Sequence, residues 1–419
     1  MSESDAVRMP DARRRPREPG DRRIGTPVRG RRPLVALIAL ATAAFAYVTA
    51  EGLPVGLVTP MSADLGVTPA AIGLLVTAYG GVVVVVSIPL ATLTLSWRRR
   101  TVMLVVLGVF TVTPIAAALA PSYGALMTAR IVMALSQSLF WAAVVPVAAG
   151  MFPPERRGRA IALVFAGSSL AGVAGLPVGT WMGQLAGWRV AMGSVAILAF
   201  AVTVAVWRWM PEPALQRTAD AGGPEASIPR YTALILLTVL GVGGLYISFT
   251  FSALFVTVVA GLGSSAIAPL LLVRGIAGLA GVWAGGILAD RRPRTSLLIP
   301  SALQAASLAA LWIAGANPAV LLASSVLSGF AFSALTTGLG TAVLKVAPRN
   351  VNLAAAGLSA GVNVGIAGGS LIGSMLVAGA VTVSAAAIVG TVAVGAVLTV
   401  LGLVVAIGEA VWPRPAHAG

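Results

Sequence analysis

Long apolar stretches recur along the whole chain, and they constrain its fold more than any other feature. A helix needs about 20 apolar residues to cross the hydrocarbon core of a bilayer. With 58% hydrophobic and only 10% charged residues, the composition lies far from that of soluble domains, in which about a quarter of residues are charged. The sequence predicts an all-α integral membrane protein with twelve transmembrane helices, at residues 34–58, 70–95, 101–120, 124–150, 158–184, 188–210, 231–257, 266–288, 295–315, 318–345, 351–379 and 383–409.

The connections between these stretches alternate between basic and nearly uncharged. The latter include Asp64 and Arg189, whereas the basic connections carry Arg98, Arg99, Arg100, Arg156, Arg157, Arg159, Arg208, Arg217, Arg230, Arg291, Arg292, Arg294, Lys345 and Arg349. Cytoplasmic loops of membrane proteins retain Arg and Lys. The alternation therefore predicts that both termini are cytoplasmic and that the protein is a multi-pass component of the plasma (inner) membrane.

Several kinds of chemistry are excluded by composition. The chain has no cysteine, and its single histidine, His417, lies in the C-terminal tail. We therefore expect no disulfide, no thiolate metal site and no histidine relay within the spans. The net charge of +15 does not predict nucleic-acid binding, because ten of the 28 basic residues fall within residues 1–32, which we expect to be disordered.

The two halves of the chain repeat each other. Residues 211–230 form the one long polar interior segment and leave six apolar stretches on either side. Six pairs share one offset (292 − 98 = 194 residues): Arg98 and Arg292, Arg100 and Arg294, Pro154 and Pro348, Gly167 and Gly361, Gly175 and Gly369, and Gly179 and Gly373. Parallel repeats are typical of transporters with a substrate path between the halves. We expect a cytoplasmic tail (1–32), a six-helix bundle (33–210), a cytoplasmic linker (211–230), a second, pseudo-symmetric bundle (231–410) and a tail (411–419).

The loop "GGILADRRPRT" (285–295) resembles the signature of the major facilitator superfamily between spans 8 and 9. The resemblance implies that Asp290, Arg291 and Arg294 tie neighbouring helices together and gate the conformational switch. The first-half copy, "LATLTLSWRRRT" (90–101), has Ser96 where the family normally has Asp. Ordinary solvated loop charges are the alternative interpretation.

The stretch "AGVAGLPVGTWMGQ" (171–184) is similar to the antiporter motif that marks exporters of this family. The resemblance assigns Gly175, Pro177 and Gly179 to that motif. Small residues at this spacing also allow two helix backbones to approach closely, so generic packing in a glycine-rich chain is the alternative. Uptake by symport fits the motif less well.

Three longer stretches, residues 49–79, 140–163 and 176–192, look like the sugar efflux and arabinose efflux permease branch of the drug:proton antiporters. This resemblance implies a secondary transporter, not an enzyme, that exports a small molecule in exchange for protons and uses the proton gradient in place of a cofactor. The expected substrate is a sugar or sugar-like compound, with antibiotics, other drugs or nucleosides as the alternative. A membrane-embedded transferase is the remote alternative. We expect a monomer whose partners are substrate, protons and lipid.

Glu51 is the one charge between Pro33 and Ser62. A charge inside a span costs about 2.5–3.5 kcal/mol on insertion scales and usually pairs or faces a cavity. Arg130 in the fourth span is expected at a similar depth, and we predict that the two residues carry proton coupling. The alternative is that Glu51 caps a helix break made by Gly52, Pro54 and Gly56.

A substrate pocket combines aromatic walls with a few polar groups. The residues predicted to line it are Tyr47, Gln137, Phe140, Trp141, Tyr246, Phe249, Phe332, Thr336 and Asn363. Arg274, the third charge within the spans, is expected to close a gate or to attract an anionic group of the substrate. Glu409 is expected to be solvated at the cytoplasmic boundary, without a role.

Overall fold

The computed structural model describes residues 31–94, 97–213, 223–348, 351–378 and 384–412. In this part of the chain twelve helices are long and apolar enough to cross a membrane, which confirms the predicted fold class. The basic tail up to residue 30, residues 214–222 of the linker and His417 lie outside the described residues. The orientation of the termini relative to the cytoplasm stays a prediction.

The first six spans form one bundle, which we call the N-bundle. Span 1 is α1 and span 5 is divided into three consecutive segments. The elements are α1 (Arg31–Gly56), α2 (Val58–Leu65), α3 (Pro69–Leu93), α4 (Arg99–Ala118), α5 (Tyr123–Gly150), α6 (Pro154–Leu170), the π-helix η1 (Ala171–Gly175), α7 (Leu176–Ala186) and α8 (Trp188–Trp209).

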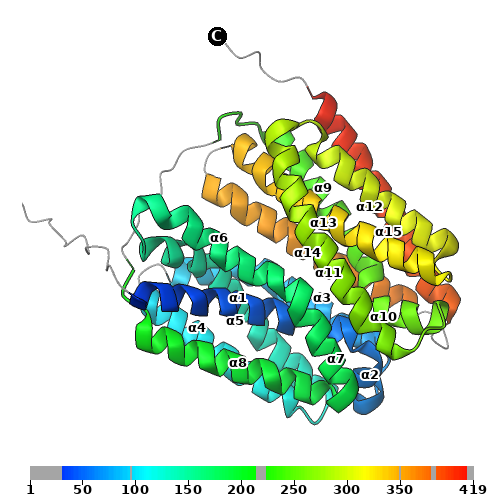
Figure 1. The fold of residues 1–419 in the computed structure, drawn as a ribbon, viewed down its shortest axis with the longest axis horizontal. Coiled ribbons are helices and arrows are strands. Elements are labelled where there is room, and N and C mark those ends of the chain that lie inside the picture. The colour runs from blue at the N-terminus through cyan, green and yellow to red at the C-terminus, as the bar shows by residue number, and fades with distance from the viewer. Residues whose placement is uncertain (1–30, 95–96, 214–222, 349–350, 379–383, 413–419) are drawn as a thin grey trace, which may run out of the picture.

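The last six spans form the C-bundle, which lies beside the N-bundle (Figure 1). Its elements are α9 (Ile228–Phe249), α10 (Ser252–Leu254), the π-helix η2 (Phe255–Val259), the 3₁₀ turn η3 (Ser264–Ala266), α11 (Ile267–Arg291), α12 (Thr295–Ala314), α13 (Pro318–Val346), α14 (Val351–Ala378) and α15 (Ala385–Val411).

Helix starts follow from local sequence. The Thr68 and Ser122 side chains accept hydrogen bonds from the main-chain N–H groups of Ala71 and Ala125 at the starts of α3 and α5. These side chains satisfy donors that have no partner within the helix. The same kind of cap begins α9, α13 and α15, at Ser227, Asn317 and Ser384.

We call the end of the bundles where α1 begins and α15 ends the terminal face, and the opposite end the distal face. The bundles contact each other through α3 against α14, and through η1 and α7 against α11. At Gly275 of α11, a Cβ would lie 2.2 Å from the main-chain oxygen of Gly172 in η1. Glycine therefore allows direct backbone contact between the halves, close to the centre of the molecule.

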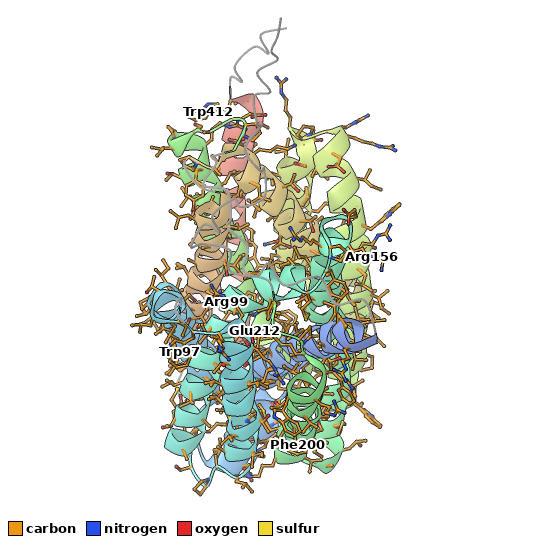
Figure 2. The ribbon with its side chains drawn as sticks, turned by 90° about the vertical axis from the view of Figure 1, so that its left-hand side faces the viewer. Trp97, Arg99, Arg156, Phe200, Glu212 and Trp412 are labelled. Atoms are coloured by element: carbon orange, nitrogen blue, oxygen red, sulfur yellow. The ribbon has the colours of Figure 1, made fainter. Side chains whose placement is uncertain are left out.

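The outer surface of the bundles is apolar. Side chains such as Phe200, which is 61% exposed, project from it (Figure 2). In the absence of lipid this exposure would be costly for a surface of such size, whereas a bilayer covers it without cost. The surface fits a multi-pass membrane protein.

The second half of the linker is attached to the C-bundle. Main-chain N–H groups of Gly223, Glu225 and Ser227 donate to the main-chain oxygens of Ala347, Lys345 and Val346, respectively, at 2.9, 2.9 and 3.1 Å. This segment follows the end of α13 before α9 begins at Ile228.

Candidate functional site

A chain of hydrogen bonds joins three spans of the N-bundle around Glu51. The Gln137 side-chain amide in α5 donates to Oε2 of Glu51 in α1 at 2.8 Å. The Tyr79 hydroxyl in α3 donates in turn to Oε1 of Gln137 at 2.6 Å. Gln137 and Tyr79 are buried, and Glu51 is half-buried. The carboxylate is thus held by a defined neutral partner rather than left in solvent.

Arg130 lies next to Glu51, but its guanidinium contacts the backbone of α1. Nη1 donates to the main-chain oxygen of Ala50 at 2.8 Å, and Nη2 donates to that of Glu51 at 3.0 Å. Among the described residues no ion pair joins Arg130 to the Glu51 carboxylate. The matching depth of the two residues is observed, whereas their expected side-chain contact is not.

The reason for this arrangement lies in Pro54, which is inside α1. Proline has no N–H group, so the carbonyl four residues earlier loses its helical partner. That carbonyl belongs to Ala50, and it is the one that Arg130 binds at 2.8 Å. Arg130 is fully buried and its guanidinium also lies 4.7 Å from the ring centre of Tyr79. It stabilises the proline-containing segment that carries Glu51.

Tyr79 was missed as a site residue by the sequence analysis. A signal was present, because Tyr79 lies ten residues into a span that begins at Pro69 on the distal side. At 1.5 Å per residue this depth is about 15 Å, close to that of Glu51. A tyrosine hydroxyl at that depth needs a partner.

Three of the aromatic residues predicted to bind substrate lie away from the inter-bundle cavity described below. Tyr47 and Phe140 are fully buried in the core of the N-bundle, where the Tyr47 ring stacks on Phe110 at 3.6 Å between ring centres. The Tyr47 hydroxyl is paired with Ser136 at 3.0 Å. Trp141 stacks on Phe165 at 5.9 Å. Tyr47 and Phe140 are therefore corrected to packing residues in this structure.

The predicted residues of the C-bundle do meet at a cavity between the bundles. Tyr246, Phe249, Phe332 and Arg274 line it from one side, and Val48 of α1 is among the residues that line it from the N-bundle. Its empty volume is about 800 Å³, part of it open to solvent. Val48 precedes Glu51 by three residues, about one helical turn, so Glu51 lies about one turn of α1 away from a residue that lines the cavity.

A wider opening lies nearer the terminal face. Thr336 and Phe165 are among its lining residues, and its empty volume is about 1040 Å³. The Thr336 hydroxyl is bonded to the main-chain oxygens of Phe332 and Ser333 in its own helix. The Asn363 side-chain amide likewise donates to the Ser359 main-chain oxygen at 2.9 Å. Within the described residues, neither side chain forms a hydrogen bond to the other bundle, and their role in binding stays a prediction.

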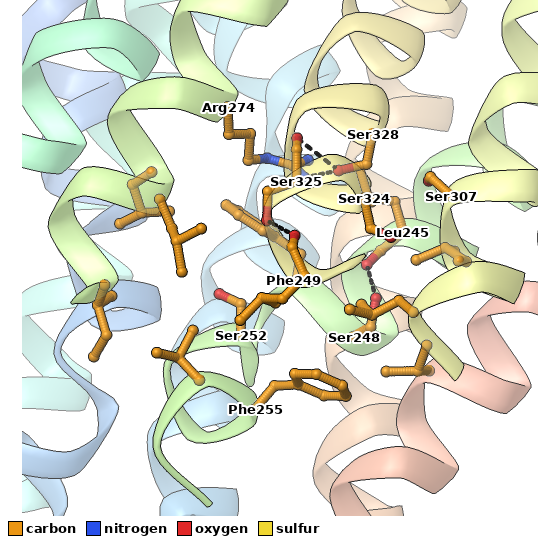
Figure 3. Close-up of a pocket in the computed structure, with 18 residues that line it drawn as sticks. Leu245, Ser248, Phe249, Ser252, Phe255, Arg274, Ser307, Ser324, Ser325 and Ser328 are labelled. Atoms are coloured by element: carbon orange, nitrogen blue, oxygen red, sulfur yellow. Dashed lines mark hydrogen bonds between the residues drawn. The ribbon is translucent and has the colours of Figure 1, made fainter. Parts of the chain in front are cut away.

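Arg274 also lines a second cavity, which lies inside the C-bundle (Figure 3). We call it the serine pocket, because six of its lining residues are serines: Ser248, Ser252, Ser307, Ser324, Ser325 and Ser328. The Arg274 guanidinium lies 4.4 Å from the ring centre of Phe249, and its Nη1 donates to the Ser328 hydroxyl. Arg274 and Phe249 border both cavities.

The antiporter-like motif packs on α1. At Gly175, a Cβ would lie 2.0 Å from the Thr49 hydroxyl oxygen, and at Gly179 it would lie 2.5 Å from a Leu53 methyl group. Pro177 is the second residue of α7, which starts where η1 ends, so the proline and the π-helix are neighbours in span 5. The close packing is a structural fact, whereas the exporter role of the motif stays a prediction.

The residues of the predicted loop signature are solvent-exposed. Asp290, Arg291 and Arg294 lie at the end of α11 and in the turn before α12, with exposed side chains. Within the described ranges, Asp290 has neither an ion pair nor a side-chain hydrogen bond. Their role in gating stays a prediction.

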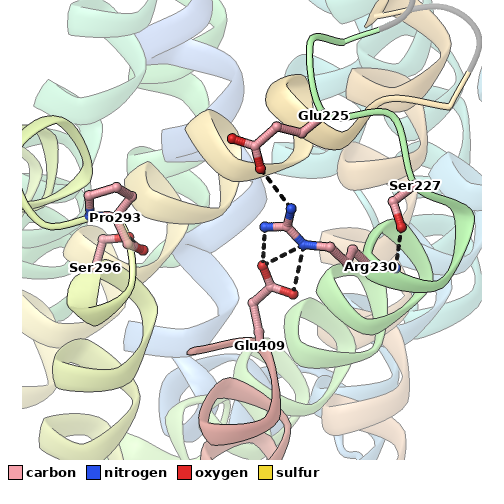
Figure 4. Close-up of polar contacts among 6 residues, drawn as sticks. All are labelled: Glu225, Ser227, Arg230, Pro293, Ser296 and Glu409. Atoms are coloured by element: carbon pink, nitrogen blue, oxygen red, sulfur yellow. Dashed lines mark hydrogen bonds and ion pairs between the residues drawn. The ribbon is translucent and has the colours of Figure 1, made fainter. Parts of the chain in front are cut away.

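The expectation for Glu409 is wrong. Its carboxylate is buried and forms an ion pair with Arg230, at 2.6 Å between Oε1 and Nη2. Glu225 of the linker binds the other side of the same guanidinium at 2.7 Å (Figure 4). Glu225 and Glu409 thus share the Arg230 guanidinium. The position of Glu409 near the end of a span did not indicate that it has this buried partner.

The distal face carries another polar cluster. Asp64, at the end of α2, accepts hydrogen bonds from the side chains of Arg189 and Trp188 at the start of α8. The Arg189 guanidinium, followed by the Trp188 N–H, lowers the pKa of the Asp64 carboxyl below its ordinary value. Arg189 also donates to the Ala120 main-chain oxygen at 2.9 Å, so it joins three connections. No group of three His, Asp or Glu side chains that could hold a metal occurs among the described residues.

Comparisons with known proteins agree with this architecture. A sequence model of the Major Facilitator Superfamily matches residues 39–306. A chloramphenicol efflux pump of Mycobacterium tuberculosis is 35% identical over 267 residues, which cover 63% of this chain and 65% of the pump. The match therefore spans less than two thirds of that relative's length.

Solved structures show the same fold. A bacterial homologue of the human lysosomal transporter Spinster, in an inward-facing and occupied conformation, superposes with a TM-score of 0.72 at 16% identity, over 93% of this chain and 100% of that one. The nucleoside transporter NupG gives a TM-score of 0.71 at 13% identity, over 90% and 99% of the two chains. The predicted resemblance is confirmed: this chain belongs to the Major Facilitator Superfamily, and its described residues form a multi-pass membrane protein.

Proposed function

We propose that this transporter exports a small amphiphilic drug-type compound in exchange for protons. The cavity between the bundles carries the proposal, because it is lined by both halves and presents aromatic walls with one basic side chain. Such a pocket fits an organic molecule with a flat apolar part and a few polar groups. The chloramphenicol efflux pump that is 35% identical over 267 residues supports export of a drug-type substrate.

For proton coupling, the geometry favours Glu51. It is half-buried, it lies one turn from the cavity-lining residue Val48, and its partner Gln137 is neutral. A carboxylate with a neutral partner can exchange a proton without breaking an ion pair. Arg130, which is bound to main-chain oxygens, would position the segment rather than neutralise the charge.

A sugar-like substrate was the first expectation from the sequence, and it stays a prediction. Sugars need several side-chain donors and acceptors around the ring, whereas the predicted amide side chains have other partners. Gln137 bonds to Glu51 and Tyr79, and Asn363 bonds to its own helix. The drug-export alternative has the support of the sequence relative.

Export can be tested in cells that lack their own efflux pumps. Cells expressing the protein should grow at a higher chloramphenicol concentration than cells with an empty vector, and should accumulate less labelled drug. Collapse of the proton gradient with an uncoupler should remove the difference in accumulation. Equal accumulation of drugs, nucleosides and sugars with and without the protein would contradict the proposal.

We also propose that the protein is a monomer in the plasma membrane. Fractionation of the same cells tests its location, and light scattering of the purified protein measures its oligomeric state.

A further inference from the structure

In the part of the chain that the structure describes, the half-buried Arg274 has no carboxylate partner, unlike the buried Arg230 of the same bundle. Within the described part of the chain, no Asp or Glu lies within ion-pair distance of its guanidinium. Arg274 lies in α11, seven residues after the helix start at Ile267. A charge within a span is costly unless it is paired or faces a cavity.

The protein supplies only part of the solvation that this guanidinium needs. Nη1 donates to the Ser328 hydroxyl, and the Phe249 ring lies beside the charge at 4.4 Å. A guanidinium carries five N–H donors in a planar fork. Its other donors have no hydrogen-bond partner among the described residues, and the side chain borders both the serine pocket and the inter-bundle cavity.

Four of the six serine hydroxyls in this pocket, those of Ser248, Ser307, Ser325 and Ser328, already donate a hydrogen bond. Ser248 and Ser325 donate to main-chain oxygens three and four residues earlier in the same helix, at 3.0 and 2.8 Å (Figure 3). Ser307 and Ser328 donate to main-chain oxygens three residues earlier, at 2.8 and 3.2 Å. A hydroxyl that donates in this way keeps lone pairs that can accept. The serine pocket therefore presents acceptors, and Arg274 is the strong donor beside them.

We propose that Arg274 and the serine pocket recognise one anionic group of the substrate together with neighbouring hydroxyl or amide donors. The anion would accept hydrogen bonds from the guanidinium donors that have no partner, since a carboxylate can form two parallel hydrogen bonds with a guanidinium. The donors would meet the serine lone pairs, and the apolar part would pack on Phe249 and Phe255. The substrate class is an amphiphilic organic acid. This inference rests on the proposed export function and names its substrate more closely.

The test compares two ligands that differ at one group: chloramphenicol hemisuccinate, which carries a carboxylate, and its methyl ester, which is uncharged and larger by one methyl group. Binding to the purified full-length protein in detergent is measured by isothermal titration calorimetry. The wild type should bind the hemisuccinate about tenfold more tightly than the methyl ester, because a charge-assisted bidentate contact is lost in the ester. Arg274→Gln should bring the two affinities within about twofold of each other.

Two further variants separate recognition from folding. Arg274→Lys keeps the charge but loses the planar fork, so an intermediate preference is expected. Arg156→Gln removes an exposed arginine at the start of α6 and should keep the wild-type preference. Thermal unfolding of each variant shows whether it is folded at the assay temperature.

Three results would overturn the proposal: no measurable binding of the hemisuccinate to the wild type, equal affinity for both ligands, or an unchanged preference in folded Arg274→Gln and Arg274→Lys. Failure of the proposed export function is read separately, from drug accumulation in cells. A charge preference that depends on Arg274 would stand even if chloramphenicol itself is not exported.

Discussion

Arg130 reaches across from α5 and donates to the main-chain oxygen of Ala50, the carbonyl that Pro54 leaves without a helical donor. The basic residue and the proline therefore depend on each other, although 76 positions separate them in the sequence (130 − 54 = 76). The same guanidinium donates to the main-chain oxygen of Glu51, whereas the Glu51 carboxylate accepts a hydrogen bond from Gln137.

This dependence can be measured with a double-mutant cycle. Arg130→Leu should lower the free energy of unfolding by about 1.5–3 kcal/mol, since a buried carbonyl loses a charged donor. In a Pro54→Ala background the N–H group returns to the helix, so the same change should cost less. Thermal unfolding of the four proteins gives the coupling. Equal costs in both backgrounds would show that Arg130 does not serve the proline.

Glu51→Gln should separate binding from proton coupling. The amide cannot release a proton, but it is nearly the same size and can still bond to Gln137. Export driven by a pH gradient in proteoliposomes should fall at least about tenfold, while exchange of labelled for unlabelled substrate persists. Gradient-driven export at the wild-type rate would leave Glu51 with the structural role of capping a helix break.

The Gly175 contact predicts a steric effect on span 5. Gly175→Ala would place a methyl group 2.0 Å from the Thr49 hydroxyl oxygen, so the Thr49 side chain, α1 or η1 has to shift. Lower thermal stability and slower transport are expected. Gly193→Ala in α8 is the control, since a Cβ there meets nothing within 4 Å and alanine favours a helix by about 1 kcal/mol. Equal behaviour of the two variants would remove the packing argument.

The Glu409 and Glu225 carboxylates bind one guanidinium but differ in exposure, with 6% and 25% of their side-chain surface exposed. Glu409→Gln should lower the free energy of unfolding by about 3–5 kcal/mol, the usual cost of removing one partner of a buried pair. Glu225→Gln should cost clearly less. Chemical unfolding followed by tryptophan fluorescence compares them, and the reverse order would contradict this ranking.

The Asp64 carboxyl should make the stability of the folded protein depend on pH. Its pKa is lowered in the folded protein by Arg189, so its stabilising contribution is present above the unfolded pKa, near 3.8, and is lost as pH falls through the folded pKa. Both partners are more than a third exposed, and the pair should contribute only about 0.2–1 kcal/mol. Asp64→Asn should therefore lower the melting temperature slightly at pH 7, and the difference should disappear in strong acid. A difference that grows below pH 4 would refute the assignment.

The sequence could predict the spans because crossing a bilayer imposes a length and an apolar composition on each helix. It could also predict the depth of Glu51 and Arg130, since rise per residue follows from helix geometry. The structure places the predicted residues Tyr246, Phe249, Phe332 and Arg274 at the cavity between the bundles, whereas their role in binding stays a prediction.

The facing direction of a side chain could not be predicted in the same way. Lipid and protein core are both apolar, so a span gives no amphipathic pattern that shows which side points inward. Tyr47 and Phe140 were therefore placed in a pocket although they pack in the core. Glu409 was misjudged for a different reason, since its partner Arg230 lies 179 residues away and meets it only through the fold.

The attachment of Gly223 to the end of α13 has a mechanical consequence for the connection between the bundles. Only residues 210–222 are left to join them, and the 14 steps from Trp209 to Gly223 (223 − 209) have a reach of at most about 50 Å. This maximum reach exceeds the roughly 8–10 Å that separate the axes of two packed helices. The movement of one bundle against the other is therefore limited by the contacts of α3 with α14 and of α7 with α11, not by the length of the linker. The linker segment that starts at Gly223 is bonded to the C-bundle and moves with it.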